Sequence, residues 1–181
     1  ELRLTLHDAH GNELIAYQPA PRKNSPMPKP VERPKAPEKI ESNEELYLTG
    51  LRIEQLHSPS FEAEPYYREA IRRDPGDYRA NTALGILLCK QWRWAEAETH
   101  FNAAIARATE HYIRPKDGEA FYYLGVALRA QGKMDAAYDA FFKAIWSHAW
   151  QAAGYFQLAE IDCQRGRWTE ALEHINRSLA S

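Results

Sequence analysis

The chain has 181 residues and nearly balanced charge, with 23 Lys and Arg against 25 Asp and Glu. This balance argues against a dedicated nucleic-acid-binding protein, which concentrates basic residues on one face. No apolar run approaches the ~20 residues that a membrane-spanning helix needs. We therefore expect neither nucleic acid nor a membrane as a partner.

Residues 1–19 are predicted to form a β-hairpin. Apolar and polar residues alternate over 2–6 and, more loosely, over 13–17, on either side of a turn-rich stretch. A lone hairpin is only marginally stable in water. We interpret it as the remnant of a preceding β domain, and the absence of a methionine before Glu1 leads us to expect a piece of a longer protein.

Residues 20–41 are predicted to be a basic, proline-rich linker. Seven of the eleven prolines lie between Pro19 and Pro37, interspersed with lysines and arginines. Such a segment is extended and semi-rigid. It is interpreted either as a spacer or as a strap laid on the helices that follow.

A helical region is predicted from residue 42, where Ser42 to Glu45 has the pattern of a capping box. Beyond it, small and aromatic residues recur in three blocks with steps of twelve, four and three residues, and in a looser first copy. Recurrence at a fixed period indicates stacked helical hairpins. Because a glycine inside a helix costs about 1 kcal/mol relative to alanine, its repetition points to close helix packing. The recurring residues are Gly85, Ala97, Phe101 and Ala104; Gly125, Ala137, Phe141 and Ala144; Ala159, Ala171, Ile175 and Ser178; and, in the looser copy, Gly50, Ala63, Tyr67 and Ala70.

This pattern resembles the tetratricopeptide repeat, in which an aromatic residue, a Leu-Gly pair, a turn glycine and an Ala–aromatic–Ala series follow one another. The block at 118–151 matches best, with Phe121, Leu124, Gly125, Gly132, Ala137, Phe141 and Ala144. The resemblance implies an all-α fold behind the β-hairpin remnant: an α/α superhelix of about four hairpins. The array would occupy 42–181, with hairpins at 42–77, 78–111, 118–151 and 152–181.

Three positions depart from the regular pattern. Trp92 stands where the second block should have its turn glycine. Six additional residues fall within 109–118, either as a longer helix with a tolerated insertion or as a loop that shapes one end of a groove. Pro65 would disrupt a helix interior, so its helix is predicted to begin near residues 62–64.

No catalytic pattern accompanies the repeats. The seven histidines show no pair at metalloprotease spacing, and no phosphate-binding loop, dinucleotide fingerprint or nucleophile elbow is present. We therefore predict a protein that is not an enzyme and needs neither cofactor nor metal. Cys89 and Cys163 lie two repeats apart, too far for a disulfide, and reduced thiols indicate a cytoplasmic location.

In this repeat the first helices of successive hairpins line a concave groove. Its aromatic residues with polar handles suit a peptide or a sugar, although Tyr122 and Phe156 could instead pack between neighbouring hairpins. The resemblance implies a non-catalytic protein–protein interaction scaffold that holds a peptide or partner there. Helical spacing places in the groove Tyr47, Leu51, Glu54, Thr82, Ile86, Cys89, Lys90, Tyr122, Val126, Arg129, Phe156, Glu160 and Cys163.

The sequence also bears on two more specific functions. Repeats of this family that clamp chaperone tails use Lys, Asn and Arg, but here Tyr47, Leu51, Glu119 and Tyr123 stand at the matching places. A chaperone-tail adaptor is therefore not expected. The order of β remnant, linker and repeats also resembles large bacterial proteins with a sugar-mutarotase-like β domain. That resemblance implies an alternative, an accessory region of a bacterial carbohydrate-active multidomain protein.

The C-terminal end is expected to expose an apolar surface. Ala171, Leu172, Ile175 and Leu179 form an apolar stripe at helical spacing. Terminal repeats normally need a polar outer face. We therefore expect this stripe to be covered by further residues or by self-association.

Overall fold

A computed structural model describes residues 2–20, 27, 32–111, 114 and 117–181, in two compact units, Glu1–Arg33 and Pro34–Ser181. In the first unit, strands β1 (Leu4–His7) and β2 (Glu13–Tyr17) pair antiparallel. Their turn is held by the Asp8 carboxylate, which accepts hydrogen bonds from the backbone N–H groups of His10 and Asn12. The side chains of both strands are exposed.

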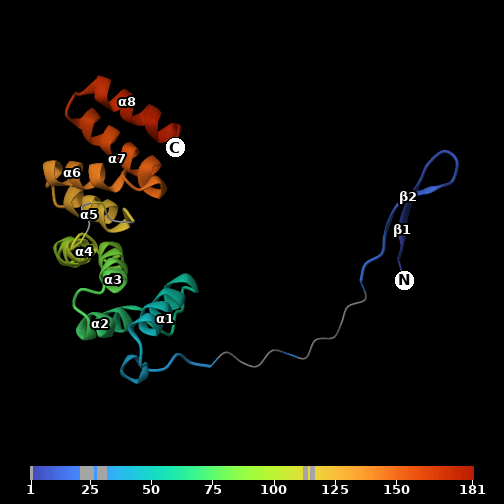
Figure 1. Ribbon diagram of the computed structural model, residues 1–181, viewed down its shortest axis with the longest axis horizontal. Coiled ribbons are helices and arrows are strands. Elements are labelled where there is room, and N and C mark those ends of the chain that lie inside the picture. The colour runs from blue at the N-terminus through green and yellow to red at the C-terminus, as the bar shows by residue number, and fades with distance from the viewer. Residues whose placement is uncertain (1, 21–26, 28–31, 112–113, 115–116) are drawn as a thin grey trace. The chain divides into compact units, whose positions relative to one another are not determined.

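The second unit stacks its helices as four hairpins in chain order (Figure 1). This confirms the predicted all-α array with an N-terminal β-hairpin. None of the helices in the described ranges is long and apolar enough to cross a membrane. The helices are α1 (Asn43–Gln55), α2 (Glu64–Arg73), α3 (Tyr78–Lys90), α4 (Trp94–Ala108), α5 (Glu119–Ala130), α6 (Met134–Ala144), α7 (Gln151–Gln164) and α8 (Trp168–Leu179), with short 3₁₀ turns η1 (Pro37–Lys39) and η2 (His148–Trp150).

Local sequence signals explain where the first helices begin. The Ser42 hydroxyl accepts a hydrogen bond from the Glu45 backbone N–H and caps α1, as the capping box predicts. Asp77 caps α3 in the same way through the Ala80 N–H. The prediction for Pro65 is confirmed as well, because α2 begins at Glu64 and the proline lies in its first turn, where no backbone N–H is required.

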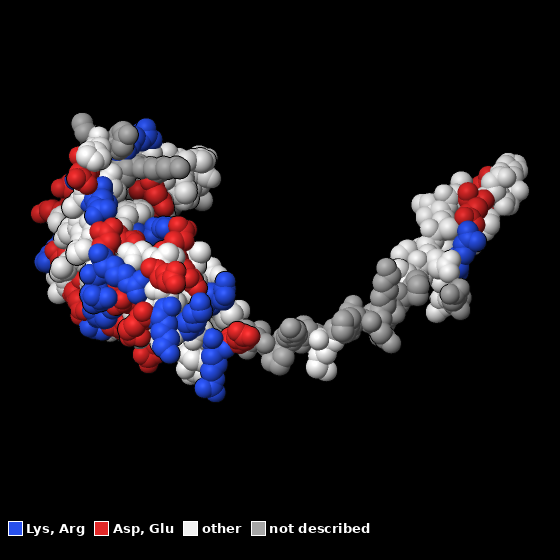
Figure 2. All heavy atoms as spheres, turned by 60° about the horizontal axis from the view of Figure 1, so that its bottom comes forward, with Lys and Arg blue, Asp and Glu red and all other residues white. Residues whose placement is uncertain are grey.

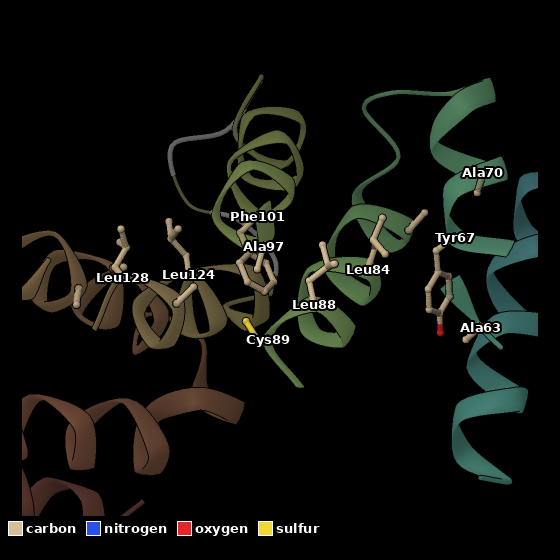
Figure 3. Packing of buried hydrophobic residues seen from close by; sticks show 14 of the residues in the cluster. Ala63, Tyr67, Ala70, Leu84, Leu88, Cys89, Ala97, Phe101, Leu124 and Leu128 are labelled. Atoms are coloured by element: carbon tan, nitrogen blue, oxygen red, sulfur yellow. The ribbon is translucent and has the colours of Figure 1, made fainter. Parts of the chain in front are cut away.

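The core lies at the crossings of paired helices. A Cβ atom added to Gly85 would lie 2.5 Å from the ring of Phe101, and one added to Gly125 would lie 2.6 Å from Phe141. The first hairpin has the same close crossing, because a Cβ on Gly50 would come within 2.6 Å of Tyr67. The large rings fill the space that the glycines leave, as Tyr67 and Phe101 show in Figure 3. Close approach therefore explains the recurring glycines.

The hairpin turns share one backbone geometry. Gly132 and Gly166 adopt φ angles of +76° and +71°, a left-handed conformation that glycine adopts without steric cost. Trp92 occupies the same place at φ +64°. Its side chain is 79% exposed and lies edge-on to Trp94, with the ring centroids 5.8 Å apart. The second hairpin thus carries backbone strain that the third and fourth avoid.

The end of the proline-rich segment packs on α2. The Tyr66 hydroxyl donates to the carbonyl of Lys35 at 2.9 Å, and the Arg73 guanidinium donates to the carbonyl of Ile40 at 2.7 Å. The Ile40 side chain is buried in the core. Residues 34–41 therefore form a strap on the first hairpin, whereas residues 21–26 and 28–31 of the predicted linker lie outside the described residues.

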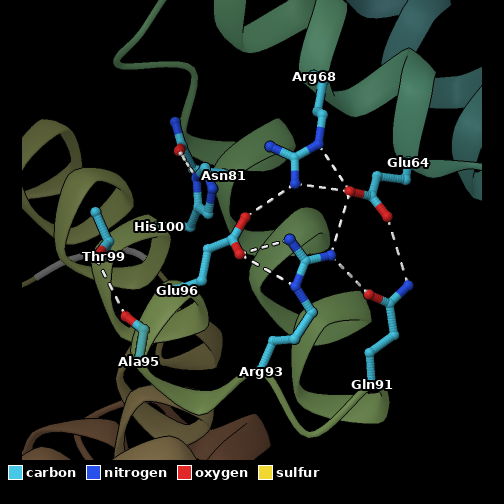
Figure 4. A network of polar contacts seen from close by, with 9 residues as sticks. All are labelled: Glu64, Arg68, Asn81, Gln91, Arg93, Ala95, Glu96, Thr99 and His100. Atoms are coloured by element: carbon cyan, nitrogen blue, oxygen red, sulfur yellow. Dashed lines mark hydrogen bonds and ion pairs between the residues drawn. The ribbon is translucent and has the colours of Figure 1, made fainter.

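Polar contacts join the second helices on the outer side of the array. Arg68 of α2 donates to Glu96 of α4 at 2.9 Å, and Glu96 also pairs with Arg93 (Figure 4). Nearby, the His100 ring nitrogen lies 2.9 Å from the amide oxygen of Asn81, whose side chain is buried. Burial lowers the pKa of His100 and so favours the neutral ring, in which the nitrogen that faces Asn81 donates to the amide oxygen.

Candidate functional site

A groove of about 1200 Å³ opens between the first two hairpins. Helices α1 and α3 supply most of its lining, and the remainder comes from the turn after α1, the end of α4, the segment before and at the start of α5, and the region around η2. Sequence reasoning placed seven residues of these two helices on an inner face. One of them, Cys89, is buried outside the lining, and the structure brings the other six together here. They are Tyr47, Leu51, Glu54, Thr82, Ile86 and Lys90.

The middle of the groove combines an apolar floor with a paired charge. Leu51 and Ile86 are half-buried and uncharged. Glu54 accepts a hydrogen bond from Lys90 at 2.9 Å and another from the buried Tyr67 hydroxyl at 2.7 Å. Burial and the bond to Glu54 raise the pKa of Tyr67. Glu54 and Lys90 therefore neutralise one another and leave the floor largely apolar.

Thr82 and Arg79 shape the groove without adding free charge to it. The Thr82 side chain is buried, and its hydroxyl donates to the Tyr78 carbonyl at 2.8 Å. Arg79 lies over the ring of Tyr47, 5.0 Å from the centroid, and pairs with Glu44 at 3.1 Å. Arg79 thereby holds the Tyr47 ring in place, whereas Thr82 bonds to the backbone of its own helix.

One end of the groove is closed by the segment between α4 and α5. Arg114 and Asp117, both from the six-residue insertion region, line the groove together with Glu119. Asp117 accepts hydrogen bonds from the indole N–H of Trp150 and from the backbone N–H of Glu119, each at 3.0 Å. Arg114 donates to the Trp146 carbonyl. The described residues thus support the interpretation of the insertion as a loop that shapes the groove, while residues 112–113 and 115–116 lie outside them.

The inner face of the third hairpin does not join this groove. Tyr122 stacks on Trp150 with the ring centroids 4.8 Å apart, and it also lies 5.6 Å from Phe141. Arg129 donates to the side chains of Gln157 and Glu160, each at 2.6 Å. Val126, on the same helix, is half-buried and is absent from the groove lining. Tyr122 therefore packs between hairpins, which was the alternative interpretation of its position.

The remaining predicted groove residues gather in a second hollow of about 510 Å³ between α7 and α8. Phe156, Glu160 and Cys163 line it beside Trp168 and Leu172. Cys163 is exposed, whereas Cys89, at the matching place in the second hairpin, is buried. The predicted inner face is therefore two separate surfaces.

Several groove residues have no counterpart in the repeat pattern. Spacing along the first helices pointed to positions in mid-helix, so it missed the first residues of α3 and α5 and everything supplied by connecting segments. The insertion was the only signal of these contributions, because a lengthened connection must lie somewhere near the helix ends. The missed lining residues are Gln55, His57, Tyr78, Arg79, Ala83, Ala108, Arg114, Asp117, Glu119, Ser147 and Ala149.

Charges of both signs are interspersed over the visible face of the helical unit (Figure 2). In the part of the chain that the structure describes, no group of three His, Cys, Asp or Glu side chains is placed to hold a metal ion. The groove therefore offers binding chemistry through apolar contact, aromatic rings and single charges.

Comparison with known proteins matches a tetratricopeptide repeat family model to residues 62–111 and 90–153, which together span just over half of the chain. Human tetratricopeptide repeat protein 7A is 30% identical over 104 residues, 58% of this chain but 11% of that protein. The chain therefore spans only a small part of that relative's length.

Solved structures show the same fold. A crystal structure of MamA resembles the chain with a TM-score of 0.65 at 21% identity, covering 76% of this chain and 77% of that one. MamA from Desulfovibrio magneticus RS-1, from residue 41 to its end, gives a TM-score of 0.64 at 21% identity over 77% and 75% of the two chains. This likeness shows a shared arrangement of helices.

Proposed function

The chain belongs to the tetratricopeptide repeat family, whose arrays are protein-interaction scaffolds, and we propose that its groove holds a peptide segment of a partner protein. The observation that carries the proposal is the groove itself. It joins an apolar floor at Leu51 and Ile86 to polar groups at its ends. A peptide offers apolar side chains, backbone polar groups and charges in the same alternation.

Blocking the groove tests this proposal. Ile86→Arg places a long charged side chain on the apolar floor, and Thr99→Arg places the same side chain on an exposed position of α4. Peptides that bind the wild-type chain should lose binding to Ile86→Arg and keep it with Thr99→Arg, as measured by fluorescence anisotropy. Circular dichroism of both variants checks that the helices remain. Equal binding by the two variants would contradict the proposal.

We also propose that the scaffold has no catalytic activity of its own and works in the cytoplasm. Both cysteines are free thiols, which suits a reducing compartment. Cell fractionation of the tagged protein measures its location, and recovery with an oxidising compartment would contradict the proposal. The carbohydrate-related alternative draws no support from the relatives described above, which bear on the helical repeats.

Self-association through the C-terminal hairpin is a further part of the proposal. In the third hairpin, Ile145 is 6% exposed because α7 crosses it so closely that a side chain on Gly154 would collide with it. Leu179 holds the corresponding place in the fourth hairpin and is 82% exposed, with Leu172 also exposed. A second copy that packs here would bury the same kind of surface that the array buries internally.

Light scattering tests this part of the proposal directly. We expect a concentration-dependent dimer that Leu179→Glu and Leu172→Glu both weaken. Glu170→Gln, on the same helix but outside the apolar stripe, is the matched control and should leave the dimer unchanged. A strictly monomeric particle at high protein concentration would overturn the idea.

A further inference from the structure

The closed end of the groove carries two carboxylates that form no ion pair with a described residue, although Arg114 lines the same end. Glu119 is the first residue of α5, and Asp117 lies two residues before it. The described hydrogen bonds to the Asp117 carboxylate come from neutral donors, the Trp150 indole and the Glu119 backbone. The Glu119 carboxylate pairs with no Lys or Arg among the described residues. Burial and the charge of Asp117 both raise the pKa of Glu119.

Two tyrosines face the same end of the groove. Tyr47 of α1 and Tyr78 of α3 line the cavity with Glu119; burial raises the pKa of each phenol, and the charge of Glu119 raises it further. Tyrosine rings and carboxylates therefore meet at this end of the groove.

The cations that line the groove are already engaged. Lys90 pairs with Glu54 at 2.9 Å, and Arg79 pairs with Glu44 at 3.1 Å. Arg114 donates to a backbone carbonyl. An anionic ligand would have to displace these contacts, whereas a cationic ligand meets the Asp117 and Glu119 carboxylates, which form no ion pair with a described cation, and the rings of Tyr78 and of Tyr47, over which Arg79 already lies.

We infer that the closed end of the groove recognises a single lysine or arginine side chain of the partner peptide, held by Glu119 and Asp117 between Tyr47 and Tyr78. The ammonium or guanidinium group supplies the donors that the carboxylates lack, and its hydrocarbon stem lies against the rings. This inference rests on the proposed function, because it specifies which partner segment the same groove selects.

Two peptide pools test the inference. Both are capped heptapeptides with randomised flanks, one with lysine fixed at the centre and one with norleucine, which keeps the stem and removes the charge. The wild-type chain should bind the lysine pool about tenfold more tightly, the size expected for one charge-assisted hydrogen bond. Glu119→Gln should lose this preference, whereas Glu170→Gln, which removes an exposed charge of α8 outside the groove, should keep it.

Thermal melting separates loss of recognition from loss of fold. The raised pKa of Glu119 means that its ionised form is disfavoured in the folded chain, and the associated cost is present at neutral pH, above that pKa. Glu119→Gln removes the cost, so this variant should melt at a higher temperature than the wild type at pH 7. A variant that is more stable but has lost its preference supports a recognition role.

The outcomes distinguish the inference from the proposed function. If neither pool binds the wild-type chain, both fail. If the two pools bind equally well and Ile86→Arg abolishes their binding, the peptide groove stands and recognition of a basic side chain is overturned. An undiminished lysine preference in Glu119→Gln overturns the inference as well.

Discussion

The first two and the last two hairpins share one packing pattern but present different inner faces. In the first two, Leu51 and Ile86 line an open groove. In the last two, Tyr122 is covered by Trp150, and Arg129 is engaged with side chains of α7. The small-residue pattern therefore decides how the helices cross, whereas residues outside that pattern decide where the inner face stays open.

The contrast between the halves comes from one connecting region. Trp150, at the end of η2, fills the inner face beside Tyr122 and also donates to Asp117 of the insertion. A single aromatic residue thereby ends the groove and positions the segment that closes it. A repeat array can in this way confine its binding surface to part of its length.

The largest loss of stability is expected from removing a buried ring at a helix crossing, where the two halves of the array are alike. Phe101→Ala and Phe141→Ala each empty a fully buried helix crossing and should each cost about 3–5 kcal/mol of stability. Chemical denaturation followed by circular dichroism measures the loss. Phe142→Ala, at an exposed position of α6, is the control and should cost far less. A large loss in only one half would contradict a shared packing pattern.

Removing the residue that separates the halves should have an intermediate effect. Trp150→Ala deletes the stacked contact with Tyr122 and the hydrogen bond to Asp117, at a cost of about 1–3 kcal/mol. It should also expose the inner face of α5, so amide exchange there should accelerate. Trp168→Ala, an exposed tryptophan in α8, is the matched control. Unchanged exchange in α5 would show that Trp150 does not cover that face.

Substitutions in the hairpin turns should have smaller effects on stability, of opposite sign in the second and third hairpins. Trp92→Gly relieves a left-handed backbone and should stabilise the chain by up to about 1 kcal/mol, despite the lost contact with Trp94. Gly132→Ala introduces that strain into the next hairpin and should destabilise it by about 1 kcal/mol. Denaturation midpoints measure both. Shifts of the same sign would contradict the strain argument.

The mildest test compares the alkylation rates of the two cysteine thiols. Burial raises the pKa of Cys89 to about 11, whereas Cys163 is exposed in the second hollow. The reactive species is the thiolate, so iodoacetamide at pH 8 should label Cys163 at least about 100-fold faster. Mass spectrometry of the labelled chain measures the two rates. Cys163→Ser should abolish fast labelling, and its persistence would place Cys89 on an accessible surface.

Much of the fold could be predicted from the sequence because its causes are local. Gly85 and Gly125 indicate close helix crossings because each lies at a fixed spacing in the sequence before Phe101 or Phe141. Pro65 reports a helix start because a proline can occupy only the first turn. Propensity and packing agree at these positions, so pattern alone was sufficient.

The extent of the groove could be predicted only in part. Helical spacing identified Tyr47 and Ile86 correctly as lining residues, since α1 and α3 present mid-helix positions to the cavity. It could not show that Trp150 would cover Tyr122, because that contact joins residues 28 positions apart through an irregular segment. It also missed Glu119, whose place at the groove depends on the path of the insertion.

The most direct test of the account maps where a bound peptide lies. A lysine-centred heptapeptide pool that carries benzophenone at one end can be cross-linked to the wild-type chain by light, and the sites can be read by mass spectrometry. We predict adducts on α1, on α3 and at the start of α5, with few on α7. The Ile86→Arg substitution should abolish these adducts. Adducts concentrated around Phe156 and Trp168, or on the outer helices, would contradict it.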